Sequence, residues 1–191
     1  MDNLLLTTEE LTLLIDLLGQ ELIEVRLEWS AELLFETVSI SIQADEIPIP
    51  TENNPWGDID TLRIKKMTRD DIHIDEQTVL TNCGNITDIF RLESLVEIEN
   101  PRQVEAAEIL GVEMPAGQGW NISIYNPDDI IPKDNLHRTL LGLQFKTDKD
   151  VEFTFYTEGV GFYVRYYKGQ GLPEELKDKC ERIKIPNARR L

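Results

Sequence analysis

Residues 70–76, with the sequence DDIHIDE, come nearest to a metal site in this chain. Alternate side chains of a β-strand lie on one face, so Asp71, His73 and Asp75 would place one imidazole between two carboxylates. Such a trio could bind a divalent ion and support a metal-dependent hydrolase. A charged edge strand has the same composition, because charges protect sheet edges from further pairing. Since no further ligand cluster supports the trio, we expect no tightly bound metal.

Other motifs for catalysis or cofactor binding are weak. His137 is the only other histidine, and no pattern of cysteine or serine beside it indicates a catalytic triad. The glycine pairs Gly117 with Gly119 and Gly169 with Gly171 lack the strand-to-helix setting of a phosphate-binding loop, so they indicate turns. The sequence therefore predicts no catalytic residue and no cofactor, and it favours a non-enzymatic protein.

The charge of the chain is strongly acidic and unevenly distributed. The 191 residues include 36 Asp or Glu and 19 Lys or Arg, which gives a formal net charge of −17. Six basic and two acidic residues lie at positions 176–191, so this tail carries +4 and the preceding residues carry −21. Such a field repels nucleic acid and anionic membranes and attracts basic proteins, although acidic surfaces also serve solubility alone. The charge favours a protein partner, in particular a basic one.

The C-terminal strands supply the candidate interface residues. Alternation predicts that Phe153, Phe155 and Val164 face the core. It leaves a set of tyrosines and one arginine on the opposite face: Tyr156, Tyr163, Arg165 and Tyr167. Tyr and Arg are frequent at binding hot spots because they bury a large area and keep a polar group. Trp56, in a proline-bearing loop, is a further candidate contact. The alternative is that a helix covers this face and the tyrosines belong to the core.

The N-terminal elements have clear sequence signals. Thr7 and Glu10 have capping-box spacing, and Gly19 stands where a left-handed residue would end the helix. From Glu21 the hydrophobic period changes to two, which indicates a strand. We expect one apolar side of this and the later alternating segments to be buried: Ile23, Val25, Leu27, Val38, Ile40, Ile42, Phe153, Phe155, Phe162 and Val164.

The complete pattern predicts an α+β fold. Alternating segments near 33–43, 62–64, 89–99, 139–146, 151–157 and 161–168 indicate a mostly antiparallel sheet. An N-terminal helix, a central helix near 101–110 and a short C-terminal helix at 172–182 would accompany it. Because no linker interrupts the pattern, we expect a single compact domain over residues 1–191, with a loose basic tail from about residue 184.

The cellular setting is predicted from the lack of export and membrane-spanning signals in the sequence. The apolar N-terminal run contains Glu9, Glu10 and Asp16 and has no basic region of the kind found in signal peptides. The sequence has no stretch of about 18 uncharged apolar residues. Two distant cysteines, Cys83 and Cys180, suit a reducing compartment as free thiols. We expect a soluble, cytoplasmic protein with no membrane partner.

Three functions are consistent with these observations. The leading hypothesis is a non-enzymatic acidic protein-binding module of the immunity, inhibitor or regulatory type, with another protein or a second copy as its partner. One alternative is the hydrolase based on Asp71, His73 and Asp75. The other is a nucleic-acid mimic, whose carboxylates would lie in a stripe spaced like phosphates.

Overall fold

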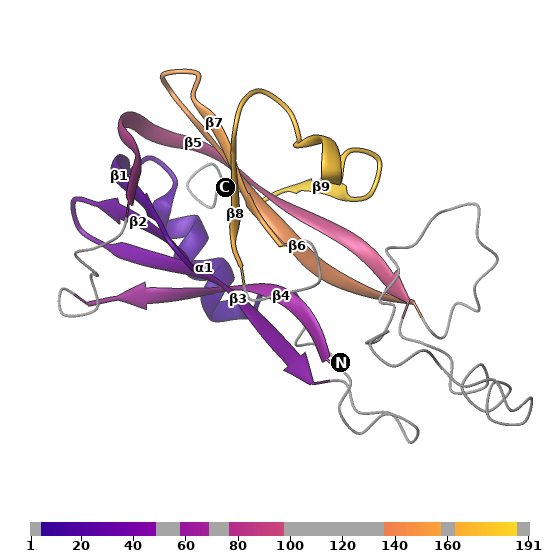
Figure 1. The fold of residues 1–191 in the computed structure, drawn as a ribbon. Coiled ribbons are helices and arrows are strands. Elements are labelled where there is room, and N and C mark those ends of the chain that lie inside the picture. The colour runs from indigo at the N-terminus through magenta and orange to yellow at the C-terminus, as the bar shows by residue number, and fades with distance from the viewer. Residues whose placement is uncertain (1–4, 49–57, 69–76, 98–135, 158–162, 187–191) are drawn as a thin grey trace, which may run out of the picture.

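The computed structural model describes residues 5–48, 58–68, 77–97, 136–157 and 163–186. Within these residues the chain forms a sheet-dominated fold with one α-helix (Figure 1). No helix in these ranges is long and apolar enough to cross a membrane. In chain order the elements are α1 (Thr8–Leu17), β1 (Glu21–Leu27), β2 (Ala31–Phe35), β3 (Ser39–Pro48), β4 (Asp58–Met67), β5 (Gln77–Glu97), β6 (Leu136–Thr147), β7 (Glu152–Tyr156), β8 (Arg165–Lys168), a 3₁₀ helix (Glu174–Leu176) and β9 (Glu181–Lys184).

All nine strands of the described residues belong to one antiparallel sheet. Its order is β4-β3-β2-β1-β5-β6-β7-β8, and β9 pairs with β5. β5 connects two parts of the sheet, because its residues 77–85 pair with β1 and its residues 86–97 pair with β6. Asn82 and Gly84 lie near the end of the part that pairs with β1 and have φ angles of 52° and 90°, so regular extended geometry is interrupted there. The interruption lets β5 belong to both parts of the sheet.

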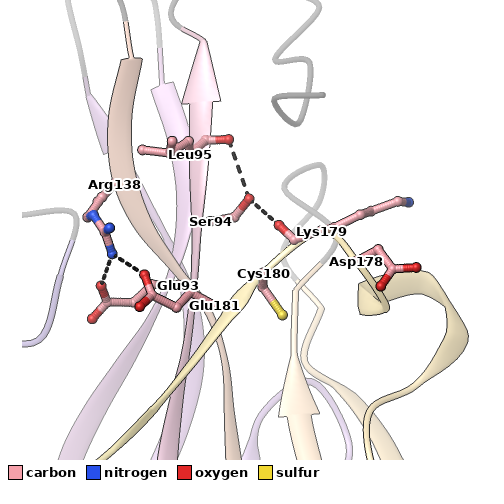
Figure 2. Close-up of a pocket in the computed structure, with 8 residues that line it drawn as sticks. All are labelled: Glu93, Ser94, Leu95, Arg138, Asp178, Lys179, Cys180 and Glu181. Atoms are coloured by element: carbon pink, nitrogen blue, oxygen red, sulfur yellow. Dashed lines mark hydrogen bonds and ion pairs between the residues drawn. The ribbon is translucent and has the colours of Figure 1, made fainter. Parts of the chain in front are cut away.

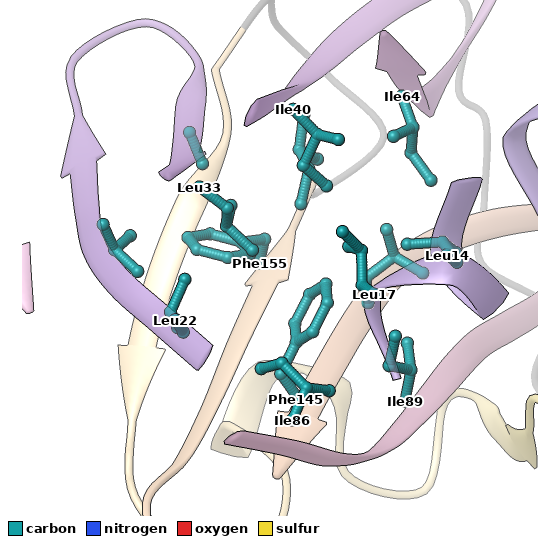
Figure 3. Packing of buried hydrophobic residues seen from close by; sticks show 14 of the residues in the cluster. Leu14, Leu17, Leu22, Leu33, Ile40, Ile64, Ile86, Ile89, Phe145 and Phe155 are labelled. Atoms are coloured by element: carbon teal, nitrogen blue, oxygen red, sulfur yellow. The ribbon is translucent and has the colours of Figure 1, made fainter. Parts of the chain in front are cut away.

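The two parts of the sheet share one large hydrophobic core (Figure 3). Phe145 of β6 stacks on Phe153 of β7 with ring centroids 5.2 Å apart, and Phe155 meets both rings edge-on at 6.0 and 5.6 Å. Buried side chains of α1, β2 and β3 belong to the same cluster: Leu14, Leu17, Leu33, Ile40 and Ile42. The helix and both parts of the sheet therefore depend on each other for burial of their apolar surface.

The N-terminal helix has the predicted boundaries. The Thr7 hydroxyl accepts the Glu10 amide at 3.2 Å, and the Glu10 carboxylate accepts the Thr7 amide at 2.7 Å, which confirms the capping box. Gly19 has a φ of 84°, which places it in the left-handed region after the helix. Glu10 also accepts the backbone amide of Ile64 at 2.9 Å and pairs with Arg63 at 3.3 Å. The helix cap therefore also contacts β4, which stands at one end of the strand order.

The expected burial is confirmed at most of the described positions but is wrong at Ile23. Val25, Ile40, Ile42, Phe153, Phe155 and Val164 are buried, Leu27 and Val38 are partly buried, and Phe162 lies outside the described residues. Ile23 is 44% exposed, whereas its neighbour Leu22 is fully buried. The pairing of β1 shifts between Leu22 and Glu24 against both β2 and β5. A bulge inserts one residue and turns the adjoining side chains to the other face.

The predicted α+β class with three helices is wrong. The described residues form mostly a large antiparallel sheet with one α-helix. Residues 172–182 contain only the three-residue 3₁₀ helix, followed by β9, which pairs with β5. Asp178 has a φ of 64°, which a right-handed helix does not allow. The central helix expected near 101–110 lies outside the described residues.

The chain after β8 packs against the outer face of the sheet, and we call residues 169–180 the C-terminal cover. Leu176 is 2% exposed and joins Tyr156, Leu92 and Leu141 in a second, smaller cluster. Gly142 makes room for this packing, because a Cβ atom there would lie 2.9 Å from the Phe155 carbonyl oxygen and 3.2 Å from the Tyr156 Cβ. The cover thus replaces the helix that the sequence predicts in this region.

Candidate functional site

An aromatic pair lies on the surface where the β1–β2 turn meets the chain entering β8. Trp29 and Tyr163 stack with ring centroids 5.2 Å apart and an interplanar angle of 24°. They remain 59% and 54% exposed. A long hydrogen bond, 3.5 Å from the Val164 amide to the Trp29 carbonyl, also joins the two segments. The fold therefore presents two large aromatic rings, 134 positions apart in sequence, as one surface feature.

Local structure explains why Trp29 leaves the core. The β1–β2 ladder ends at the pair Leu27 and Ala31, and the Glu28 amide donates to the Ser30 carbonyl within the turn. Trp29 therefore lies at the tip of a hairpin rather than on the apolar side of a strand. Its indole N–H donates to the Glu28 carboxylate at 3.1 Å, so its polar atom has a partner while the ring stays accessible.

The structure separates the predicted interface residues. Tyr156 is 5% exposed and belongs to the second cluster, and Tyr167 packs partly buried against the same cluster. Arg165 is exposed and pairs in register with Tyr156, while Tyr163 belongs to the aromatic pair. Trp56 lies outside the described residues. The interface residues predicted from the sequence do not include Trp29, although the adjoining Ser30 is a signal for a turn.

A hollow of about 260 Å³ lies where β9 begins beside β5 and β6, and we call it the Glu93 hollow (Figure 2). Glu93 is 4% exposed and pairs with Arg91 at 3.1 Å and with Arg138 at 3.3 Å. Arg138 also pairs with Glu181 of β9 at 2.9 Å, and hydrogen bonds to Glu181 and Glu93 raise the pKa of its guanidinium. The Ser94 hydroxyl donates to the Lys179 carbonyl at 2.6 Å. These contacts hold β9 against β5 and β6.

The chemistry available in the Glu93 hollow is poor for catalysis. Burial raises the pKa of the Cys180 thiol to about 11, and its sulfur lies 3.4 Å from the Leu176 carbonyl oxygen. Burial also raises the pKa of Cys83, which is 2% exposed elsewhere in the core. Because the thiolate is the nucleophile, the raised pKa values lower the reactivity of both cysteines near neutral pH. The hollow is best explained as an ion-paired junction between strands.

Metal binding has no support within the described part of the chain. No group of three or more His, Cys, Asp or Glu side chains there could hold a metal ion. Asp71, His73 and Asp75 lie outside the described residues, so the hydrolase hypothesis stays a prediction. Comparisons with protein-family models, curated proteins and solved structures find no match to this chain.

Proposed function

We propose that this protein is a non-enzymatic binding module that holds a basic protein at the aromatic pair. The observation that carries the proposal is the stacked arrangement of Trp29 and Tyr163, both more than half exposed. Large apolar side chains normally contribute stability through burial, and these two forgo most of that contribution. Their exposure is explained if a partner buries them. Such a role would suit an immunity, inhibitor or regulatory protein.

The aromatic pair has the properties of a binding hot spot. Trp and Tyr bury a large area for few rotatable bonds, so little conformational entropy is lost when a partner fixes them. Stacking at 5.2 Å already restrains both rings, and the Val164 amide restrains the backbone beneath Trp29. The surface is therefore preorganised before the partner arrives. Preorganisation raises affinity because the conformational entropy of these residues is lost during folding and not during binding.

Charge favours a basic protein over a second copy. Two copies with a net charge of −17 repel each other, whereas a basic partner is drawn in by the same field. Glu28, which is exposed, brings a carboxylate directly to the indole of Trp29. A basic side chain of the partner would find both a negative charge and an aromatic face at this point. We therefore assign the encounter to charge and the lasting contact to the aromatic pair.

Affinity capture tests the proposal with the full chain. The bait proteins are the wild type, the double variant Trp29→Ala/Tyr163→Ala and the control Ile23→Ala, which truncates another exposed apolar residue six positions before Trp29. Each is immobilised and incubated with an extract of the organism that makes the protein. We expect a basic protein that is retained by the wild type and the control but lost from the double variant. Equal retention by all three baits would exclude the aromatic pair as the binding surface.

A further inference from the structure

A second hollow, of about 290 Å³, lies across β2, β3 and β4, and we call it the Ser41 hollow. Strand register places Glu32, Ser41 and Lys65 side by side on these three neighbouring strands. Ile40 and Ile42, which flank Ser41, belong to the large core. Because neighbouring side chains of a strand alternate, Ser41 lies on the opposite face of the sheet. Ser41 and the hollow therefore lie on the face of the sheet opposite the large core.

The Ser41 hydroxyl is the feature that ordinary sheet structure does not explain. Ser41 is 5% exposed, and its hydroxyl oxygen has no hydrogen-bond partner among the described residues. Buried hydroxyl groups in folded proteins are nearly always hydrogen-bonded, because an unpaired polar group loses its interactions with water. The exposed lysines of β4 also suit a strand at the end of a sheet, where such charges prevent further pairing. That explanation does not extend to a buried hydroxyl without a partner.

Two lysines are among the other groups of the Ser41 hollow. Lys65 and Lys66 both line it and both are exposed. The Lys65 ammonium donates to the Gln43 side-chain oxygen at 3.1 Å, which fixes that amide beside the hollow. Against these two positive charges stands one carboxylate, that of Glu32, which is 1% exposed. The lining thus carries a net charge of +1 in a protein of net charge −17.

We propose that the Ser41 hollow binds a small carboxylate, which accepts hydrogen bonds from Ser41 and Lys65. A charge-assisted bond from an ammonium is stronger than one between neutral groups, so Lys65 would supply most of the affinity. The Ser41 hydroxyl would gain the acceptor that the chain does not give it. Glu32 limits the negative charge that the hollow tolerates, because like charges close together repel. A carboxylate monoanion is therefore favoured over the more highly charged phosphate.

The probes are acetate, lactate and inorganic phosphate, added to the full chain at constant ionic strength with chloride as the balancing anion. Binding is followed through backbone amide chemical shifts in NMR titrations at pH 7. We expect saturable shifts of Ser41 and Lys65 with the carboxylates. Lys65→Met should weaken that binding about tenfold, the loss typical of one charged hydrogen bond. Lys168→Met makes the same charge change on β8 and should leave the affinity unchanged.

Ser41→Ala separates a binding role from a structural one. Removing a hydroxyl without an internal partner should leave the thermal unfolding midpoint equal or higher, while carboxylate affinity falls several-fold. A lower midpoint would show that the hydroxyl is needed by the fold and would overturn the assignment. Shifts that do not saturate, or that persist in Lys65→Met, would show nonspecific ion binding and would also overturn it. Saturable binding of phosphate without binding of carboxylates would refute the stated ligand class.

Discussion

Tyr156 and Tyr163 lie seven positions apart and are both predicted to occupy one face of a hairpin, yet their environments differ. Tyr156 is 5% exposed in the second cluster, where Leu176 of the C-terminal cover packs beside it. Tyr163 is 54% exposed and stacks on Trp29. The two tyrosines have the same chemistry and different neighbours. The tertiary cover, rather than residue type or alternation, therefore decides which aromatic residue is available to a partner.

The C-terminal cover also explains why the aromatic pair is a better candidate for binding a partner than Tyr156. Hydrogen bonds hold the C-terminal cover in addition to the second cluster: the Gln144 side chain donates to the Gly171 carbonyl at 2.5 Å, and the Ser94 hydroxyl donates to the Lys179 carbonyl at 2.6 Å. Binding at Tyr156 would have to displace these contacts first. Binding at Trp29 and Tyr163 requires no such displacement, so more of the interaction energy is retained as affinity.

Tyr156→Ala should give the largest change in stability. The substitution removes a buried aromatic ring from the second cluster, and such truncations cost about 3–5 kcal/mol. Tyr163→Ala should cost less than about 1 kcal/mol, because an exposed ring loses only its stacking partner. Urea unfolding of both variants measures the difference. Similar losses in the free energy of unfolding would show that the C-terminal cover does not distinguish Tyr156 from Tyr163.

Alkylation of Cys180 reports on the same cover. With a pKa of about 11 instead of the ordinary 9.0, the native thiol has about 100-fold less thiolate near pH 8. In a Cys83→Ser background, iodoacetamide should therefore modify the native protein about 100-fold more slowly than the urea-unfolded protein. Tyr156→Ala should accelerate the reaction by loosening the cover. A native rate equal to the unfolded rate would mean that the cover does not shield Cys180.

Arg138→Met should have a moderate effect on stability. It removes one of the two arginines that pair with the buried Glu93 and releases Glu181 of β9. Because Arg138 is half exposed and Arg91 remains, we expect a loss of about 1–2 kcal/mol rather than the larger cost of isolating a buried charge. Lys177→Met is the matched control, since Lys177 pairs with Glu174 at 3.6 Å in an exposed position. Equal thermal stability of the two variants would assign no structural role to the Glu93 junction.

The sequence was most informative where structure depends on neighbouring residues. The capping box of Thr7 and Glu10 and most of the strand segments are present as predicted. The errors concern contacts between distant segments. The bulge that exposes Ile23 is visible only as a pairing shift against two other strands, and the spacing of Leu176 and Cys180 imitates a helix turn. Pairing of β9 with β5 supplies hydrogen bonds that a local pattern does not predict.

The candidate site shows the same limit. Tyrosine and arginine in the C-terminal strands indicated a binding surface, and Tyr163 remains part of the proposed one. Its partner ring, Trp29, comes from a hairpin tip 134 positions earlier, and it is not among the interface residues predicted from the sequence. The length of β1 decides where Trp29 lies, because a strand that ends at Leu27 leaves Trp29 in the turn. Strand ends depend on pairing, which the sequence alone does not specify.

The dissociation rate of the captured basic partner tests the central claim most directly. Purified partner is bound to immobilised wild type, Trp29→Ala/Tyr163→Ala and Ile23→Ala, and dissociation is followed by surface plasmon resonance. Loss of a hot spot worth at least about 2 kcal/mol should make the partner leave the double variant roughly 30-fold faster, while the control keeps the wild-type rate. Raising the salt concentration should instead slow association in all three. An unchanged dissociation rate in a folded double variant would contradict the assignment of binding to the aromatic pair.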